Sequence, residues 1–184
     1  MNNKIKIAWG ITGSGDKIRE TFEMMSKLSH KYEEKYDIEI FISKSGEQVL
    51  KYYNILNPLK ITFKKIWVEQ DANTPFLIGR IQNGEFKLLL IAPATSNTVA
   101  KVAHGISDTM LTNGIIQALK VYVPVFIMPS DLKEGLTTTI LPNKRVMKIR
   151  IRKEDVDNVK TISNMDGITI IEKVEDIQQV FENN

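Results

Sequence analysis

Three hydroxyl-rich segments, 13–15, 43–46 and 95–98, have the residue types that bind phosphate groups. Each follows a strand-like run and precedes a helical pattern, so free backbone amides and the positive end of a helix dipole should face one crevice. The candidate ligand-binding residues are Gly13, Ser14, Gly15, Ser43, Ser45, Thr95, Ser96, Asn97 and Thr98. An ordinary turn remains the alternative at 13–15, because glycine and serine are common in turns, and Asp16 would repel an anion unless it caps the helix.

Short apolar runs alternate with amphipathic segments, which is the pattern of strand–helix–strand units. We predict strands at 5–9, 38–42, 87–93, 123–128, 147–152 and 168–171, and helices at 16–32, 49–53, 99–104, 108–119, 155–163 and 175–181. The segment 57–86 fits either a strand pair or an irregular helix, with a loop at 71–75. The pattern therefore predicts an α/β fold with one doubly wound, mostly parallel sheet and helices on both faces, whose ligands bind at the carboxyl ends of the strands.

The composition is that of an ordinary globular domain: 184 residues, 42% hydrophobic and 26% charged, which we read as a single domain over 1–184. The absence of cysteine excludes disulfides, thiolate catalysis and cysteine-ligated zinc or iron–sulfur clusters, so redox chemistry would need an organic cofactor or a non-thiolate metal. A net charge of +3 indicates no nucleic-acid partner. The short apolar run at the N-terminus is too brief for a signal peptide or a membrane span, so we expect a cytoplasmic protein without a membrane partner.

The run 92–108 carries the most specific pattern in the sequence. It contains Pro-Ala-Thr-Ser-Asn-Thr at 93–98, followed by Ala-Lys at 100–101 and Gly-Ile-Ser-Asp at 105–108. This run resembles the central motif of the flavoprotein superfamily of homo-oligomeric flavin-containing cysteine decarboxylases. The resemblance spans about residues 5–130. It implies a Rossmann-like flavoprotein fold, FMN at a subunit interface, a homo-oligomer built from trimers, and FMN contacts from Gly13, Ser14, Ser43, Thr95, Ser96, Asn97 and Thr98.

Two departures argue against cysteine decarboxylation. The decarboxylases of the superfamily have a histidine before the central motif, and none occurs in 67–86; they also have a Pro-x-Met-Asn clamp, where this chain reads Ile-Met-Pro-Ser-Asp-Leu at 127–132. The segments 128–135, 150–159 and 165–177 instead resemble the archaeal flavoproteins and the related dihydromethanopterin reductases.

That resemblance implies an FMN oxidoreductase. Its donor would be a ferredoxin-like protein or reduced nicotinamide, and its acceptor dihydromethanopterin or another dihydropterin. The alternatives are an electron-transfer flavoprotein without a small organic substrate, a non-redox module that binds a phosphorylated metabolite and, least favoured, an FMN-dependent decarboxylase.

Asn97, Asp108 and the basic segment 144–153 each allow two interpretations. Asn97 could be a plain helix cap or a flavin ligand, and Asp108 could cap the next helix or serve the flavin or an interface. No residue is identified as catalytic, His104 is a lone helical histidine, and no cluster has metal-ligand spacing. The basic segment 144–153 places Lys148, Arg150 and Arg152 on one face of a predicted strand. It reads either as a solvated edge that resists strand pairing or as a docking site for an acidic electron carrier or the acidic tail of a pterin.

Overall fold

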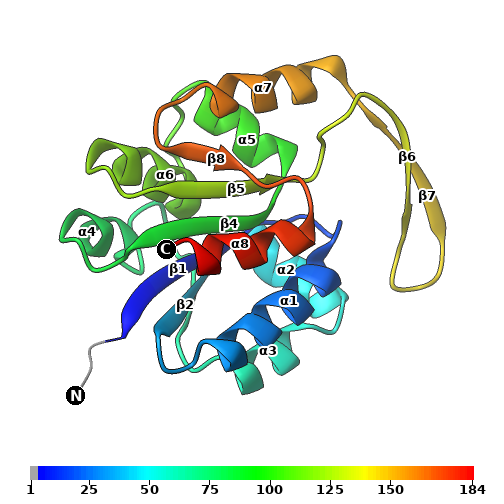
Figure 1. Cartoon of the computed structure of the whole chain (residues 1–184). Helices are drawn as coiled ribbons and strands as arrows, with labels where there is room; N and C mark the ends of the chain where they lie inside the picture. The colour runs from blue at the N-terminus through cyan, green and yellow to red at the C-terminus, as the bar shows by residue number, and fades with distance from the viewer. Residues whose placement is uncertain (1–3) are drawn as a thin grey trace.

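A six-stranded parallel sheet forms the centre of the protein (Figure 1). The structure is a computed structural model that describes residues 4–184, apart from the side chain of Ile140. In spatial order the strands are β3 (Ile66–Val68), β2 (Tyr36–Ile42), β1 (Ile5–Ile11), β4 (Leu88–Ala94), β5 (Val125–Pro129) and β8 (Ile168–Ile170). All five neighbouring pairs are parallel. The strand order reverses direction between β1 and β4, so the predicted doubly wound fold is confirmed.

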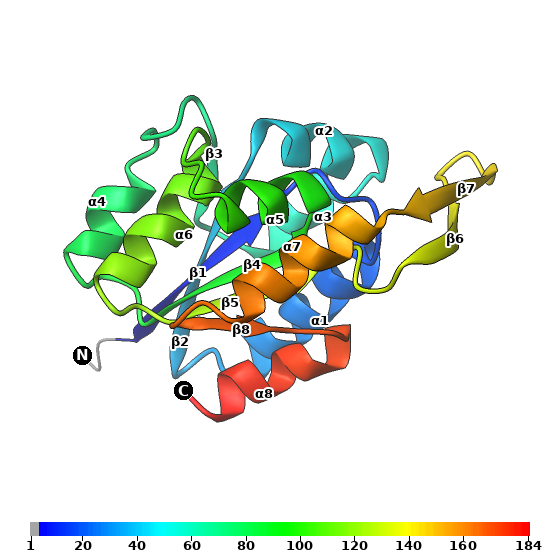
Figure 2. The ribbon, with the colours of Figure 1, turned by 90° about the horizontal axis from the view of Figure 1, so that it is seen from above.

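Helices cover both faces of the sheet (Figures 1 and 2). One face packs against α1 (Ile18–Lys31), α2 (Lys44–Tyr52), α3 (Leu56–Thr62), the short 3-10 helix η1 (Val174–Asp176) and α8 (Ile177–Glu182). The other face packs against α4 (Leu77–Gln82), α5 (Ser96–Ala103), α6 (Met110–Lys120) and α7 (Lys153–Ser163). In the part of the chain that the structure describes, no helix has the length and apolar character needed to cross a bilayer.

Strand β1 shows how the sequence builds the two cores. Ile7, Trp9 and Ile11 point into the core beneath α1 and α8, whereas Ala8 belongs to the core beneath α4 to α7. This alternation follows from the two-residue period of a strand. On the second face, a Cβ added to Gly10 would lie 2.5 Å from Ile91 Cδ1 and 2.9 Å from Leu111 Cδ2, so glycine there lets these two side chains pack directly over β1.

Three predicted segments differ from the structure. The ambiguous segment 57–86 forms two short helices, α3 and α4, on either side of the edge strand β3. The helix predicted from residue 108 begins at Met110, and its cap is Thr109, so Asp108 is not the cap. The predicted helix at 16–32 begins at Ile18, after Lys17 in a left-handed conformation, so Asp16 is not its cap either.

The basic strand predicted at 147–152 exists, but it lies outside the main sheet. It is β7 (Val146–Ile151), which pairs antiparallel with β6 (Gly135–Ile140), a strand that the sequence did not reveal. In the sequence the hairpin lies between β5 and α7, and in space it projects from the body of the molecule (Figures 1 and 2). Arg152 lies beyond the strand, where its guanidinium pairs with Asp155 at 2.6 Å at the start of α7. Arg152 therefore does not share a strand face with Lys148 and Arg150.

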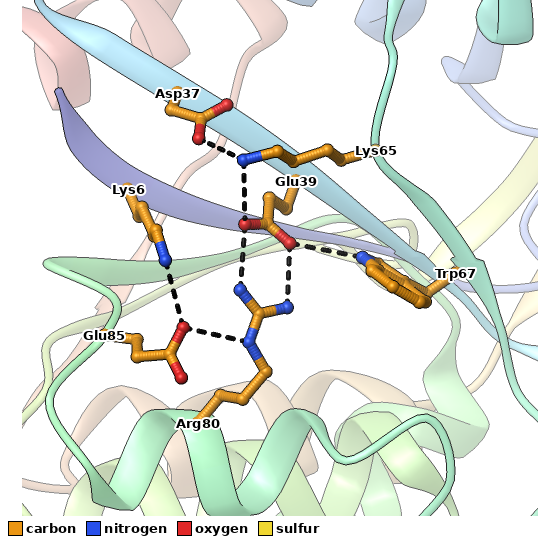
Figure 3. A network of polar contacts seen from close by, with 7 residues as sticks. All are labelled: Lys6, Asp37, Glu39, Lys65, Trp67, Arg80 and Glu85. Carbon is orange, nitrogen blue, oxygen red and sulfur yellow. Dashed lines mark hydrogen bonds and ion pairs between the residues drawn. The ribbon is translucent and has the colours of Figure 1, made fainter.

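An ion-pair network ties α4 to the sheet (Figure 3). Glu39 of β2 is 2% exposed, and its two carboxylate oxygens each accept a 2.8 Å hydrogen bond from the Arg80 guanidinium. The Trp67 indole nitrogen donates to the same carboxylate at 3.2 Å. Burial alone would raise the pKa of Glu39, but the Arg80 and Trp67 hydrogen bonds and the Lys65 charge hold this pKa below its usual value. The carboxylate is therefore buried in its charged form.

Candidate functional site

The carboxyl ends of β1 and β4 are joined by the hydroxyl group of Thr12. This hydroxyl donates to the Pro93 carbonyl at 2.8 Å and accepts from the Thr95 amide at 2.9 Å. The loop after β1 is thereby held against the start of α5. The loops at 13–15 and 95–98, which are far apart in sequence, form one surface, as the sheet topology requires.

Two of the predicted hydroxyl residues are helix caps. Ser43 accepts from the Gly46 amide at 3.0 Å at the start of α2, and Thr95 accepts from the Thr98 amide at 3.2 Å at the start of α5. Capping satisfies part of the first helical turn and fixes the direction in which the remaining amides point. The plain cap interpretation is wrong for Asn97, which is the second residue of α5 and has an exposed side chain.

The predicted residues border two adjoining cavities at this edge of the sheet. A cavity of about 410 Å³, the first cavity, is bordered by Gly13, Ser14, Gly15, Thr95 and Ser96. A cavity of about 310 Å³, the second cavity, is bordered by Ser43, Ser45, Thr95, Asn97, Thr98 and Asp108. Every predicted residue thus lies on one of the two, and Thr95 lies on both.

The first cavity combines free donors with paired hydroxyls. Among residues 4–184, the backbone amides of Gly13, Ser14 and Gly15 have no hydrogen-bond partner. The Ser14 hydroxyl lies 2.6 Å from the hydroxyl of Ser130, which also donates to the Ala94 carbonyl at 3.1 Å. Ser130 was not predicted, because a single serine after a strand forms no pattern. Donors of this kind suit a phosphate or another oxyanion.

Two carboxyl groups also border the first cavity. The Ser96 hydroxyl donates to Asp131, and Asp16 lies near enough for the Asp131 charge to influence it. Burial raises the pKa of Asp16, and the charges of Glu20 and Asp131 add to this rise against the opposing effect of Lys17. A raised pKa lessens the repulsion that Asp16 would exert on an anion bound at the neighbouring amides.

An apolar wall completes the first cavity. Val49 and Tyr52 come from α2, Tyr53 follows this helix, and Leu141, Met147 and Ile149 come from the hairpin. The hairpin side of this wall was not predicted, although the alternating pattern of 147–152 predicted a strand there. Apolar walls with a few oriented polar groups are typical of sites for small organic ligands.

The second cavity is organised by a buried carboxylate. Glu69 is 9% exposed and accepts from the Lys44 amide at 3.0 Å and the Met110 amide at 2.7 Å, so it joins the first residues of α2 and α6. Asp108 is held by the Lys101 ammonium at 2.8 Å. Lys44 and Lys101 are the two cations on this cavity.

Gly13 and Gly15 have a packing role of their own. A Cβ on Gly13 would lie 2.7 Å from Ser45 Cβ, and one on Gly15 would lie 2.5 Å from Tyr53 Oη. Both glycines therefore let the loop after β1 approach α2. The close approach at Gly13 brings the Ser45 hydroxyl, which lies 3.3 Å from that of Ser43, to the same loop as the free amides.

Comparison with known proteins gives consistent matches. An uncharacterized protein of Methanocaldococcus jannaschii is 47% identical over 177 residues, covering 96% of this chain and 94% of that one. The dihydromethanopterin reductase (acceptor) of the same organism is 38% identical over 144 residues, covering 75% of this chain but only 58% of the reductase.

The crystal structure of Burkholderia xenovorans DmrB with FMN, described as a cubic protein cage for redox transfer, has a TM-score of 0.82 at 30% identity and covers 100% of this chain and 96% of that one. The flavoprotein family matches residues 1–182. With a doubly wound sheet, hydroxyl-rich strand ends and these matches, the chain belongs to the flavoprotein family.

Proposed function

We propose that this chain binds FMN without a covalent bond and acts as an oxidoreductase. It would pass electrons from a ferredoxin-like protein or reduced nicotinamide to an acceptor such as dihydromethanopterin or another dihydropterin. The observation that carries the proposal is the set of free amides at Gly13, Ser14 and Gly15, which lies beside an apolar wall in one cavity. An FMN molecule needs both, since it has an anionic end and a flat aromatic end.

The donors of the two cavities fit the polar parts of FMN. The free amides at 13–15 and the hydroxyls of Ser43 and Ser45 lie close together and would hold the phosphate. The hydroxyl and amide groups of Thr95, Ser96, Asn97 and Thr98 lie at the start of α5 and would serve the ribityl chain and the ring edge. Asp108, which pairs with Lys101, would act through that lysine at the rim of the second cavity.

The protein's contribution would be orientation and exclusion of water. Bound FMN supplies the hydride chemistry, and donors placed around a flavin tune its reduction potential. The hairpin residues Met147 and Ile149 and the aromatic residues Tyr52 and Tyr53 would shield the first cavity from solvent. Ser130 would position Ser14 through their shared hydrogen bond.

Relatives support the choice of acceptor and the assembly. The reductases of Methanocaldococcus jannaschii and Methanosarcina mazei are 38% and 35% identical and are named for dihydromethanopterin. Because this chain spans somewhat less than two thirds of their length, at 58% and 59%, the pterin substrate is part of the proposal. A homo-oligomer built from trimers and a cytoplasmic location are also part of it, and the cage assembly of DmrB supports the former.

The visible absorbance spectrum of the purified protein tests the proposal. We expect two flavin bands, present on purification or after FMN is added, that bleach when a reductant is added without oxygen. Reoxidation of the bleached protein by a dihydropterin would identify a pterin reductase. A colourless protein that does not retain FMN would contradict the proposal and indicate another phosphorylated ligand at the same strand ends.

An electron-transfer role without an organic substrate is the main alternative. Rapid reduction by a donor protein, combined with no reoxidation by any dihydropterin, would favour it. A decarboxylase remains the least favoured function, because the chain lacks the histidine and the Met-Asn pair that mark the decarboxylases of this superfamily.

A further inference from the structure

The two faces of the β6–β7 hairpin differ in chemistry. Paired residues of an antiparallel hairpin point to the same face. The pairs Thr137–Ile149 and Thr139–Met147 border the first cavity and form the inner face. By this alternation, Leu136, Arg150, Lys148 and Val146 have side chains on the outer face, whereas Thr138, which pairs with Lys148, also borders the first cavity.

The outer face and the adjacent turn carry unpaired positive charge. Lys144, Arg145, Lys148 and Arg150 are all exposed, and within the described residues none of them forms an ion pair. The next two cations along the chain behave differently, since Arg152 pairs with Asp155 and Lys153 pairs with Asp157. The hairpin thus places four exposed cations, without ion pairs among residues 4–184, within the short segment 144–150.

Large apolar side chains accompany these cations. Leu136 is 80% exposed and Val146 is 65% exposed, next to Arg150 and Lys148. Complementary charge raises the rate at which two proteins meet and fixes their orientation, and apolar side chains contribute to the contact that follows. Together they fit a protein partner whose surface has carboxylates around an apolar centre.

We propose that the outer face of the hairpin, defined by Leu136, Val146, Lys148 and Arg150, docks an acidic electron-carrier protein. This inference rests on the proposed function. The inner face of the same hairpin borders the first cavity, so a carrier on the outer face would lie one sheet layer from the flavin. A second copy of this chain presenting the same hairpin would bring like charges together. A small substrate in the cavity would meet the inner face instead.

The electron balance is simple for a one-electron iron–sulfur carrier. Two reduced carriers each lose one electron. The flavin gains these two electrons and takes up two protons from solvent as it becomes the hydroquinone. No residue of the hairpin is oxidised or reduced, and the role of Lys148 and Arg150 is to orient the carrier.

The test compares two double variants of the FMN-loaded protein. Lys148→Glu with Arg150→Glu changes the outer face, whereas Lys27→Glu with Lys60→Glu makes the same change in net charge at exposed positions of α1 and α3. The probe is a ferredoxin with a single iron–sulfur cluster and an acidic surface. Its binding in the oxidised form is measured by calorimetry, and its rate of flavin reduction by stopped-flow absorbance, each at low and high salt.

At low salt, we expect the hairpin variant to bind ferredoxin at least about tenfold more weakly than the wild type. Its flavin should also be reduced by ferredoxin at least about tenfold more slowly. Both differences should shrink at high salt. The control variant should match the wild type, and dithionite should reduce all three proteins equally.

Equal rates of flavin reduction by ferredoxin in the two variants, or a rate that does not depend on salt concentration, would overturn the proposal. A changed assembly mass for the hairpin variant alone would also overturn it, by assigning the surface to a contact between subunits. If no variant retains FMN, the proposed function fails, yet the binding measurement still tests the docking surface.

Discussion

The hydroxyl oxygens of Ser14 and Ser130 lie 2.6 Å apart, although 116 residues separate them in the chain. Ser14 follows β1 and Ser130 follows β5, so this hydrogen bond joins strand ends on the two sides of β4. The Ser130 amide also donates to the Ala94 carbonyl at 2.9 Å, which fixes the residue to the end of β4. The position of Ser14 in the first cavity therefore depends on a residue from a distant part of the sequence.

Replacing Ser130 by alanine should weaken FMN binding about fivefold, because losing one hydrogen bond costs about 1 kcal/mol. The protein without FMN should lose about 1–2 kcal/mol of stability and stay folded, since two hydroxyl contacts are lost but the amide of residue 130 keeps its bond to Ala94. Fluorescence titration with FMN measures the affinity. Ser29→Ala, which removes a local hydroxyl contact in α1, is the control. Equal affinities in the two variants would exclude a positioning role for Ser130.

Replacing Gly13 by alanine should displace the loop after β1 from α2, because the new Cβ would lie 2.7 Å from Ser45. We expect FMN affinity to fall at least about tenfold. Adding Ser45→Gly removes the colliding atoms and should restore part of the affinity, even though it also removes a hydroxyl. Gly79→Ala is the control, since nothing lies within 4 Å of its Cβ position, and it should raise stability by about 0.5–1 kcal/mol in helix α4. A Gly13 variant that binds FMN normally would show that the loop tolerates displacement.

Replacing Asn97 by leucine should abolish FMN retention without unfolding the protein. Asn97 is exposed and is not the cap of α5, so its side chain contributes little to stability. The bound flavin per subunit after gel filtration measures retention, and the melting temperature of the protein without FMN measures the fold. Full retention of FMN would remove Asn97 from the site.

Replacing Glu39 by glutamine should destabilise the protein by about 2 kcal/mol near neutral pH, because Arg80 would lose its buried carboxylate partner and keep only Glu85 among the described residues. Replacing both residues by leucine should cost less than the single change, because no buried charge is then left unpaired. Urea unfolding measures all three proteins. A double variant less stable than the single one would show that the pair is strongly favourable in itself.

The same carboxylate predicts a pH dependence. The pKa of Glu39 is lower in the folded protein than its usual value of 4.5, so its contribution to stability is present above pH 4.5 and is lost as the pH falls through the folded pKa. The free energy of unfolding of the wild type should fall more steeply in acid than that of Glu39→Gln. Parallel curves for the two proteins would contradict this assignment.

The sequence predicted the strands and loops that can be recognised from neighbouring residues alone. The continuous apolar run at 87–93 predicted a central strand, which the structure has at Leu88–Ala94. The hydroxyl residues after β1, β2 and β4 predicted which loops border the cavities. The sequence did not predict the secondary structure of 57–86, because α3 and α4 have only seven and six residues and are too short to display a helical period.

The missed site residues share a different cause. Thr12, Glu69 and Ser130 each make two long-range hydrogen bonds to partners that only the tertiary fold brings near. Strand β6 was also missed, since Gly-Leu-Thr-Thr-Thr-Ile has no apolar alternation strong enough to distinguish a strand from a loop.

The hairpin also has an evolutionary consequence. Over residues 4–184 it shares no strand pairing with the main sheet, since β6 and β7 pair only with each other. Its length and sequence can therefore drift between homologues without disturbing the register of the six central strands. Selection can reshape the inner face to accept a new substrate and the outer face to accept a new redox partner, while the strand-end loops keep the ancestral cofactor. One interchangeable module of the chain would then account for diversification of reactions on a constant scaffold.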